Sequence, residues 1–239
     1  MTDEAALLAT LAEHPGDDDT RLVYADWLEE RGEVQRAAVL RGIAALARVP
    51  FDDDRAVPAA RKLLATSAGV VAEWLELVSH PRLEGTVWGL RDEGDRPYFL
   101  AFLPGGKLAY RRADDGTAGT WGQVGAAMWF AINDYSSHEG VFTADRLKGD
   151  AANDMKMTWR VRGIRLPDGA LDGALEDGSP PDLPPDLIDS PHVQNDRLPA
   201  GAPRPRERIT ARGVVWWADG KAKAKRARRT GRSRSRRPC

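Results

Sequence analysis

The spacing of apolar side chains changes near residue 82, and this change constrains the fold more than any other feature of the chain. Before residue 82, apolar residues recur every three or four positions, as they do along one face of a helix. After it they alternate with polar residues, most clearly from Met155 to Arg162, where Met155, Met157 and Trp159 share one face. A strand with one buried face explains such alternation. The sequence therefore predicts an α+β fold, with helices first and an antiparallel sheet second.

A small helical bundle is predicted over residues 1–81. Helices are expected at 3–13, between the turn at 17–20 and the glycine at 32, at 33–49 and at 57–78. The side-chain oxygens of the 17–20 turn suit the cap of the helix that follows. The acidic clusters at 17–19 and 52–54 are interpreted as helix-start loops rather than cation sites, because neither has the glycine and terminal glutamate of a calcium loop.

A small antiparallel β-barrel is predicted over residues 82–166. Short strands are expected at 85–91, 98–103, 107–112, 119–124, 126–132, 140–144, 146–151 and 155–162, with turn residues between them. Eight strands without intervening helices favour a meander that closes on itself, with an interior wide enough for its own side chains or one small ligand.

Three segments of different composition follow the predicted barrel. Residues 167–208 are rich in proline and aspartate, which predicts a disordered acidic linker. Residues 209–220 form an apolar island that contains Val214, Val215, Trp216 and Trp217. We expect this island to return to the sheet and bury itself on a sheet edge, while stacking of its tryptophans on nucleic-acid bases is the alternative. Residues 221–239 are predicted to be a disordered basic tail.

The tail is the strongest functional signal in the sequence. The formal net charge of −1 divides into −7 for residues 1–81, +1 for 82–166, −5 for 167–220 and +10 for 221–239. A cluster of cations without acids suits the phosphates of nucleic acid, bound without sequence specificity. An acidic protein surface, which includes this chain's own acidic body, and a membrane surface are the alternatives. The predicted nucleic-acid-binding residues are Lys221, Lys223, Lys225, Arg226, Arg228, Arg229, Arg232, Arg234, Arg236 and Arg237.

A second candidate site lies in the predicted barrel. Trp88, Trp121 and Trp159 are candidates to line a ligand cavity, although such residues also form ordinary barrel cores. The polar run at 133–138, with Asn133, Tyr135 and His138, is interpreted as a loop at the barrel mouth, where binding barrels place specificity groups. An ordinary turn is the simpler alternative for this loop.

Several protein classes are disfavoured by what the sequence lacks. Cys239 is the only cysteine and the four histidines are scattered, so neither a metal site nor a cofactor site is predicted. The chain has no phosphate-binding loop, dinucleotide fingerprint or hydrolase motif, and we therefore predict that the protein is not an enzyme. Acid-base chemistry around His138 is a third possibility. The N-terminus has no secretory signal pattern and no segment suits a transmembrane helix, so a cytoplasmic location is expected.

Residues 18–33, DDTRLVYADWLEERGE, resemble the repeat-companion domain of planctomycete and myxobacterial proteins, and the similarity extends over residues 8–41. That family is a short helical module without established activity. The resemblance implies an interaction module that binds a protein partner, and it carries over no catalytic residue.

Two strings in the predicted barrel, at 85–88 and 119–121, resemble the glycine-x-tryptophan signatures of lipocalin-like and avidin-like barrels. The resemblance concerns architecture and implies no particular ligand. Together these features predict a non-enzymatic binding or adaptor protein that a basic tail tethers to nucleic acid. The alternative is a small-molecule-binding barrel whose tail is incidental.

Overall fold

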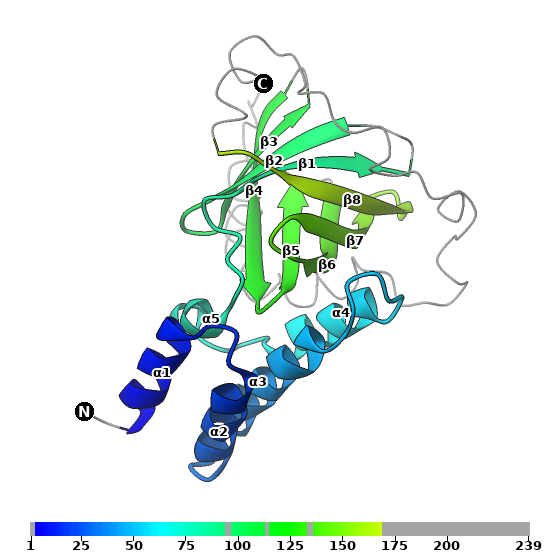
Figure 1. Cartoon of the computed structure of the whole chain (residues 1–239). Coiled ribbons are helices and arrows are strands. Elements are labelled where there is room, and N and C mark those ends of the chain that lie inside the picture. Colours follow the sequence, from blue (N-terminus) through cyan, green and yellow to red (C-terminus); the bar gives the residue numbers. More distant parts are fainter. Residues whose placement is uncertain (1–2, 94–96, 113–114, 133–135, 169–239) are drawn as a thin grey trace, which may run out of the picture.

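The computed structural model describes residues 3–93, 97–112, 115–132 and 136–168. Five helices come first and an eight-stranded closed barrel follows, so the predicted α+β order is confirmed (Figure 1). The apolar island, the basic tail and nearly all of the linker lie outside the described residues. Among the described helices, none combines the length and the apolar character needed to cross a bilayer.

The helices are α1 (Asp3–Glu13), α2 (Asp18–Glu29), α3 (Val34–Ala47), α4 (Ala56–Thr66) and α5 (Ala72–Val78). The predicted helix at 57–78 is wrong, because the chain breaks it into α4 and α5. Gly69 has a φ of 85°, which a right-handed helix does not allow and which glycine adopts at little cost. The break turns α5 so that it packs against α1.

The predicted cap before α2 is confirmed in detail. Asp17 adopts extended backbone angles, and its Oδ1 accepts hydrogen bonds from the main-chain nitrogens of Asp19 (3.1 Å) and Thr20 (3.0 Å). These bonds satisfy donors that have no partner within the first turn of a helix. The Asp17 carboxylate is therefore part of the helix start.

The strands are β1 (Val87–Asp92), β2 (Pro97–Leu103), β3 (Lys107–Arg112), β4 (Asp115–Val124), β5 (Ala127–Ile132), β6 (Ser136–Phe142), β7 (Arg146–Asn153) and β8 (Thr158–Leu166). Each strand pairs antiparallel with the next, and β1 pairs with β8 to close the ring. The predicted barrel is confirmed. We call the end with the β2–β3, β4–β5 and β6–β7 turns the proximal end, and the opposite end the distal end.

Three predicted strand starts are wrong. β4 begins at Asp115 rather than at residue 119. β6 begins at Ser136 rather than at residue 140, and β8 begins at Thr158 rather than at residue 155. Met155 and Met157, predicted to face the core, are 64% and 51% exposed. They lie in the turn before β8, where Lys156 has a positive φ of 63°. The alternation at 155–157 therefore belongs to the turn before β8.

The helices pack on the outer surface of one side of the barrel, near its proximal end. α4 lies mainly against β5 and β6, and α5 lies against β4 (Figure 1). Apolar side chains of the helices share one core with Val124, Ala127 and Val141, which project outward from the barrel. Because this core contains side chains from both parts, the helical layer and the barrel stabilise each other.

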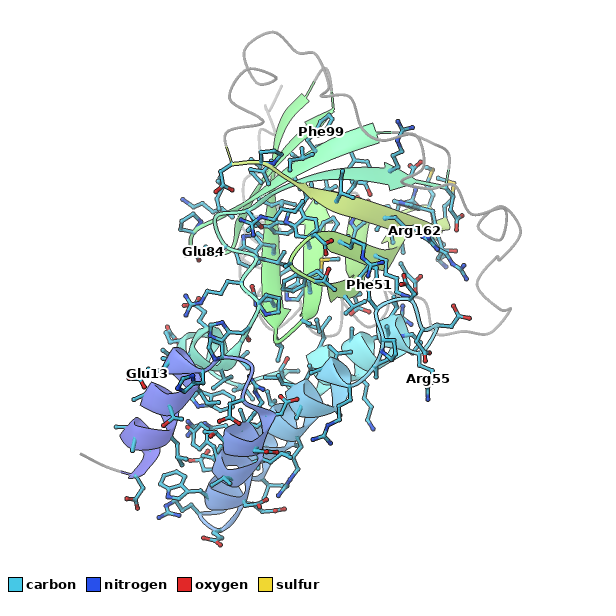
Figure 2. All side chains as sticks on the ribbon, viewed as in Figure 1. Glu13, Phe51, Arg55, Glu84, Phe99 and Arg162 are labelled. Atoms are coloured by element: carbon cyan, nitrogen blue, oxygen red, sulfur yellow. The ribbon has the colours of Figure 1, made fainter. Side chains whose placement is uncertain are left out.

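The loop between α3 and α4 also contacts the barrel. Phe51 lies beneath two cations of β7, with the Arg146 guanidinium 4.6 Å and the Lys148 ammonium 5.3 Å from its ring centre (Figure 2). Lys148 Nζ donates to the main-chain oxygen of Asp53 at 3.0 Å, and Arg146 pairs with Asp52 at 3.2 Å. Main-chain and side-chain groups of the second acidic cluster therefore anchor the helical layer to β7.

Candidate functional site

The proximal half of the barrel interior is filled by aromatic side chains. Phe102 packs edge-on against Trp121 and Phe130, with ring centres 5.4 and 6.0 Å apart. The indole nitrogen of Trp121 donates to the main-chain oxygen of Leu103 at 2.9 Å, and that of Trp88 donates to Thr86 Oγ1 at 2.8 Å. Because both indole donors are bonded within the protein, Trp88 and Trp121 act as core residues here.

The distal half of the interior holds a second aromatic group with a histidine at its centre. His138 stacks on Phe130, with ring centres 4.1 Å apart, and meets the edge of Trp159 at 5.9 Å. Tyr98 lies 6.4 Å from His138, and Tyr110 lies 5.9 Å from Tyr98. We call these five residues the distal cluster.

His138 is the polar centre of the distal cluster, and it is 1% exposed. Burial among aromatic rings penalises the charged imidazolium and lowers the pKa of His138 to about 3, while the main chain of Phe130 opposes this shift more weakly. Within the part of the chain that the structure describes, Nδ1 makes no hydrogen bond of normal geometry. The ring is therefore neutral at physiological pH and retains unused hydrogen-bonding capacity.

The placement of His138 corrects the predicted mouth loop. His138 lies in strand β6 and points into the barrel, while Asn133 and Tyr135 lie outside the described residues. Of the predicted barrel residues, the structure brings His138 and Trp159 together and places Trp88 and Trp121 in the other half.

A buried charge cluster joins the helical layer to the barrel wall. Arg61 of α4 donates from Nε to Glu139 Oε2 of β6 at 2.9 Å, and from Nη2 to Asp150 Oδ2 of β7 at 2.7 Å. All three side chains are buried. Sequence reasoning missed this cluster because its members are 78 and 89 positions apart and no local pattern connects them.

Another polar network lies inside the helical layer, around Tyr24 of the repeat-companion-like string. The Tyr24 hydroxyl donates to Glu4 Oε1 at 2.6 Å and accepts from Trp74 Nε1 and Arg36 Nη2, both at 3.0 Å. Burial and the adjacent Glu4 raise the pKa of Tyr24. This network links α1, α2, α3 and α5, so the role of Tyr24 is structural.

The remaining predicted features divide between loops and undescribed residues. In the second acidic cluster, Asp53 Oδ1 accepts from the main-chain nitrogen of Arg55 at 2.8 Å, next to the start of α4. Over residues 3–168, less the three short gaps, no group of three or more His, Cys, Asp or Glu side chains is placed to hold a metal ion. The ten basic residues of the tail, from Lys221 to Arg237, lie outside the described residues.

No family model, curated protein or solved structure matches this chain. The relation of residues 8–41 to repeat-companion domains therefore stays a prediction from the sequence. A function for the chain has to be argued from its own geometry and charge.

Proposed function

We propose that this protein is a non-enzymatic binding or adaptor protein of the cytoplasm, and that its basic tail tethers it to nucleic acid. The observation that carries the proposal is the charge of the tail, with ten cations and no acid in residues 221–239. Each phosphate that a cation neutralises releases a counterion, and this release favours binding without regard to sequence. The helical module binds a protein partner, as the resemblance to repeat-companion domains implies.

The barrel supports an adaptor role more than a carrier role. Trp88 and Trp121 bond within the protein, and the largest interior side chains, among them Phe102 and Phe130, are fully buried against one another. An interior filled in this way gives a rigid body. The histidine suggested for acid-base chemistry is buried, with a pKa of about 3, which does not suit proton exchange at neutral pH.

Fluorescence anisotropy of labelled single-stranded RNA and duplex DNA tests the tether. We expect the full chain to bind both, and a chain ending at residue 220 to bind neither. With about six phosphate contacts, affinity falls about 10³-fold between 50 and 200 mM salt.

A variant of equal length tests whether the positive charges of the tail are what binds nucleic acid. Replacing Lys221, Lys223, Lys225 and Arg226 with glutamine removes four cations and leaves the tail length unchanged. The log-log salt slope then becomes shallower by about 0.9 for each phosphate contact that is lost. Binding that persists in the truncated chain, or absence of binding by the full chain, contradicts the tether.

A second candidate function is supported by the distal cluster. Nδ1 of His138 is buried among aromatic rings without a hydrogen bond of normal geometry to the described residues. Because these rings are closely packed, a ligand would have to displace one of them, and a flat molecule with one hydrogen-bonding group would then complement the imidazole. Calorimetry with 2-naphthol and with naphthalene, which lacks the hydroxyl, tests this candidate. It predicts that naphthol binds at least about tenfold more tightly, a difference of 1.4 kcal/mol, and that His138→Phe abolishes the preference.

A further inference from the structure

The outer surface of β1, β2 and β8 carries an apolar patch away from the helices. Val87 pairs with Ala101 on one side and with Leu166 on the other. Two residues further along β1, on the same face, Gly89 pairs with Phe99 and with Ile164. The five side chains of these paired positions cluster together. We call Val87, Phe99, Ala101, Ile164 and Leu166 the outer patch.

Two members of the outer patch are buried although they point away from the barrel core. Phe99 is 5% exposed and Leu166 is 8% exposed. The described helices pack mainly on β4 to β7, on another side of the barrel, and Figure 2 shows Phe99 far from them. The helical layer therefore does not account for this burial.

Because the barrel is closed, the way in which an apolar segment can pack on this surface is restricted. β1 and β8 pair along Val87–Asp92 and Val161–Leu166, so neither strand offers a free edge there. An added segment cannot extend the sheet by main-chain pairing and has to lie across its face through side-chain contacts. At this place the island would therefore lie on the face of the sheet and would not add a strand at an edge.

We propose that the apolar island at residues 209–217 docks on the outer patch of its own barrel. β8 ends at Leu166, a member of the patch, so the chain leaves the barrel beside the surface that the island would cover. The 42 residues at 167–208 have an average reach of roughly 35 Å if flexible, enough to return to the patch. Trp216 and Trp217 supply large apolar side chains, which suit an apolar surface such as the outer patch.

Docking of the island would also position the tail. The first tail residue, Lys221, follows Trp217 by four positions, so the basic residues would start at the barrel wall beside β1, β2 and β8. This inference concerns a contact within the chain and does not depend on nucleic-acid binding. Failure of one proposal leaves the other intact.

Thiol labelling of the full chain tests the docked contact. Cys239 is replaced by serine and a cysteine is placed in the outer patch, as Ala101→Cys in one protein and Val87→Cys in another. Each is combined with Trp216→Ser and Trp217→Ser, and the rate of maleimide labelling is measured. We expect at least about tenfold faster labelling once the tryptophans are lost, which corresponds to 1.4 kcal/mol of protection. Ala45→Cys, at an exposed site on α3, should label at an unchanged rate.

The alternative occupants give different results. Leu171→Ser with Leu175→Ser removes the first two leucines that follow β8 in the sequence, and faster labelling in this variant alone assigns the cover to that segment and overturns the proposal. A rate that falls as protein concentration rises indicates a second copy and also overturns it. Equal rates with and without Trp216 and Trp217 have the same consequence.

Discussion

Arg61 Nε lies 2.9 Å from Glu139 Oε2, and this buried contact crosses from helix α4 to strand β6. The same guanidinium reaches Asp150 of β7, so one cation holds two carboxylates of neighbouring strands. Glu139 is 0% exposed, which means that its charge is separated from water by the helix that supplies its partner. The contact therefore fixes the position of α4 on the barrel.

Removing the guanidinium should strongly destabilise the protein. In Arg61→Met the carboxylates of Glu139 and Asp150 stay buried without this partner, and breaking such a pair costs about 3–5 kcal/mol. Urea unfolding measures the loss. The control is Arg55→Met, in which an exposed ion pair with Asp53 is lost at a cost of about 1 kcal/mol or less. If the two variants lose equal stability, the buried pair does not hold the helical layer.

Removing the hydroxyl of Tyr24 should destabilise the helical layer even though the aromatic ring is kept. Tyr24→Phe keeps the ring but leaves Trp74 Nε1 and Glu4 without this hydrogen-bond partner inside the helical layer. Loss of a buried hydrogen-bond partner costs about 1–3 kcal/mol, which thermal or urea unfolding detects. Thr66→Val removes one hydroxyl bond at the surface and should stay within about 0.5 kcal/mol of the parent protein. Equal effects in the two variants would argue against the network.

The spacing of apolar residues in the sequence correctly predicted those helices and strands that have one buried face. The limits of α1 match those expected, and the count and order of the eight strands are as predicted. The helix at 57–78 was wrong because its apolar spacing continues through the break at Gly69. The start of β6 was missed because α4 covers the outside of that strand, so both faces are buried and the alternation disappears.

The candidate site was only partly predictable, for a related reason. A run of Ser136, Ser137 and His138 reads as a loop, since polar residues are rare inside small barrels. The pairing of His138 with Phe130 depends on the register between β5 and β6, which no single segment encodes. The same holds for Arg61 and Glu139, whose contact forms only when the helical layer meets the finished barrel.

Close approach of β6 and β7 should make Gly149 intolerant of a side chain. Gly140 and Gly149 face each other in the register, and a Cβ on Gly149 would lie 2.4 Å from the main-chain oxygen of Glu139. Gly149→Ala therefore forces the two strands apart, at a cost of about 1–3 kcal/mol in urea unfolding. Gly16→Ala is the matched control, since a Cβ there meets nothing within 4 Å. A stable Gly149→Ala protein would show that the strands separate easily.

The buried imidazole of His138 should make the protein less stable in mild acid. The pKa of His138 is about 3 in the folded chain and about 6.5 in the unfolded chain, so between these values only the unfolded chain binds the proton. Stability from the neutral ring is complete above pH 6.5 and falls as the pH decreases towards 3. Between pH 6.5 and 5 the loss amounts to about 2 kcal/mol.

Urea unfolding across this pH range measures the effect of His138. His138→Phe removes the titrating group and keeps an aromatic ring against Phe130, so its free energy of unfolding should depend less steeply on pH by about one proton. His14→Gln, at an exposed position, controls for loss of a histidine. Parallel pH profiles for the parent protein and His138→Phe would mean that the pKa of His138 is the same in the folded and unfolded chains, so that burial does not lower it.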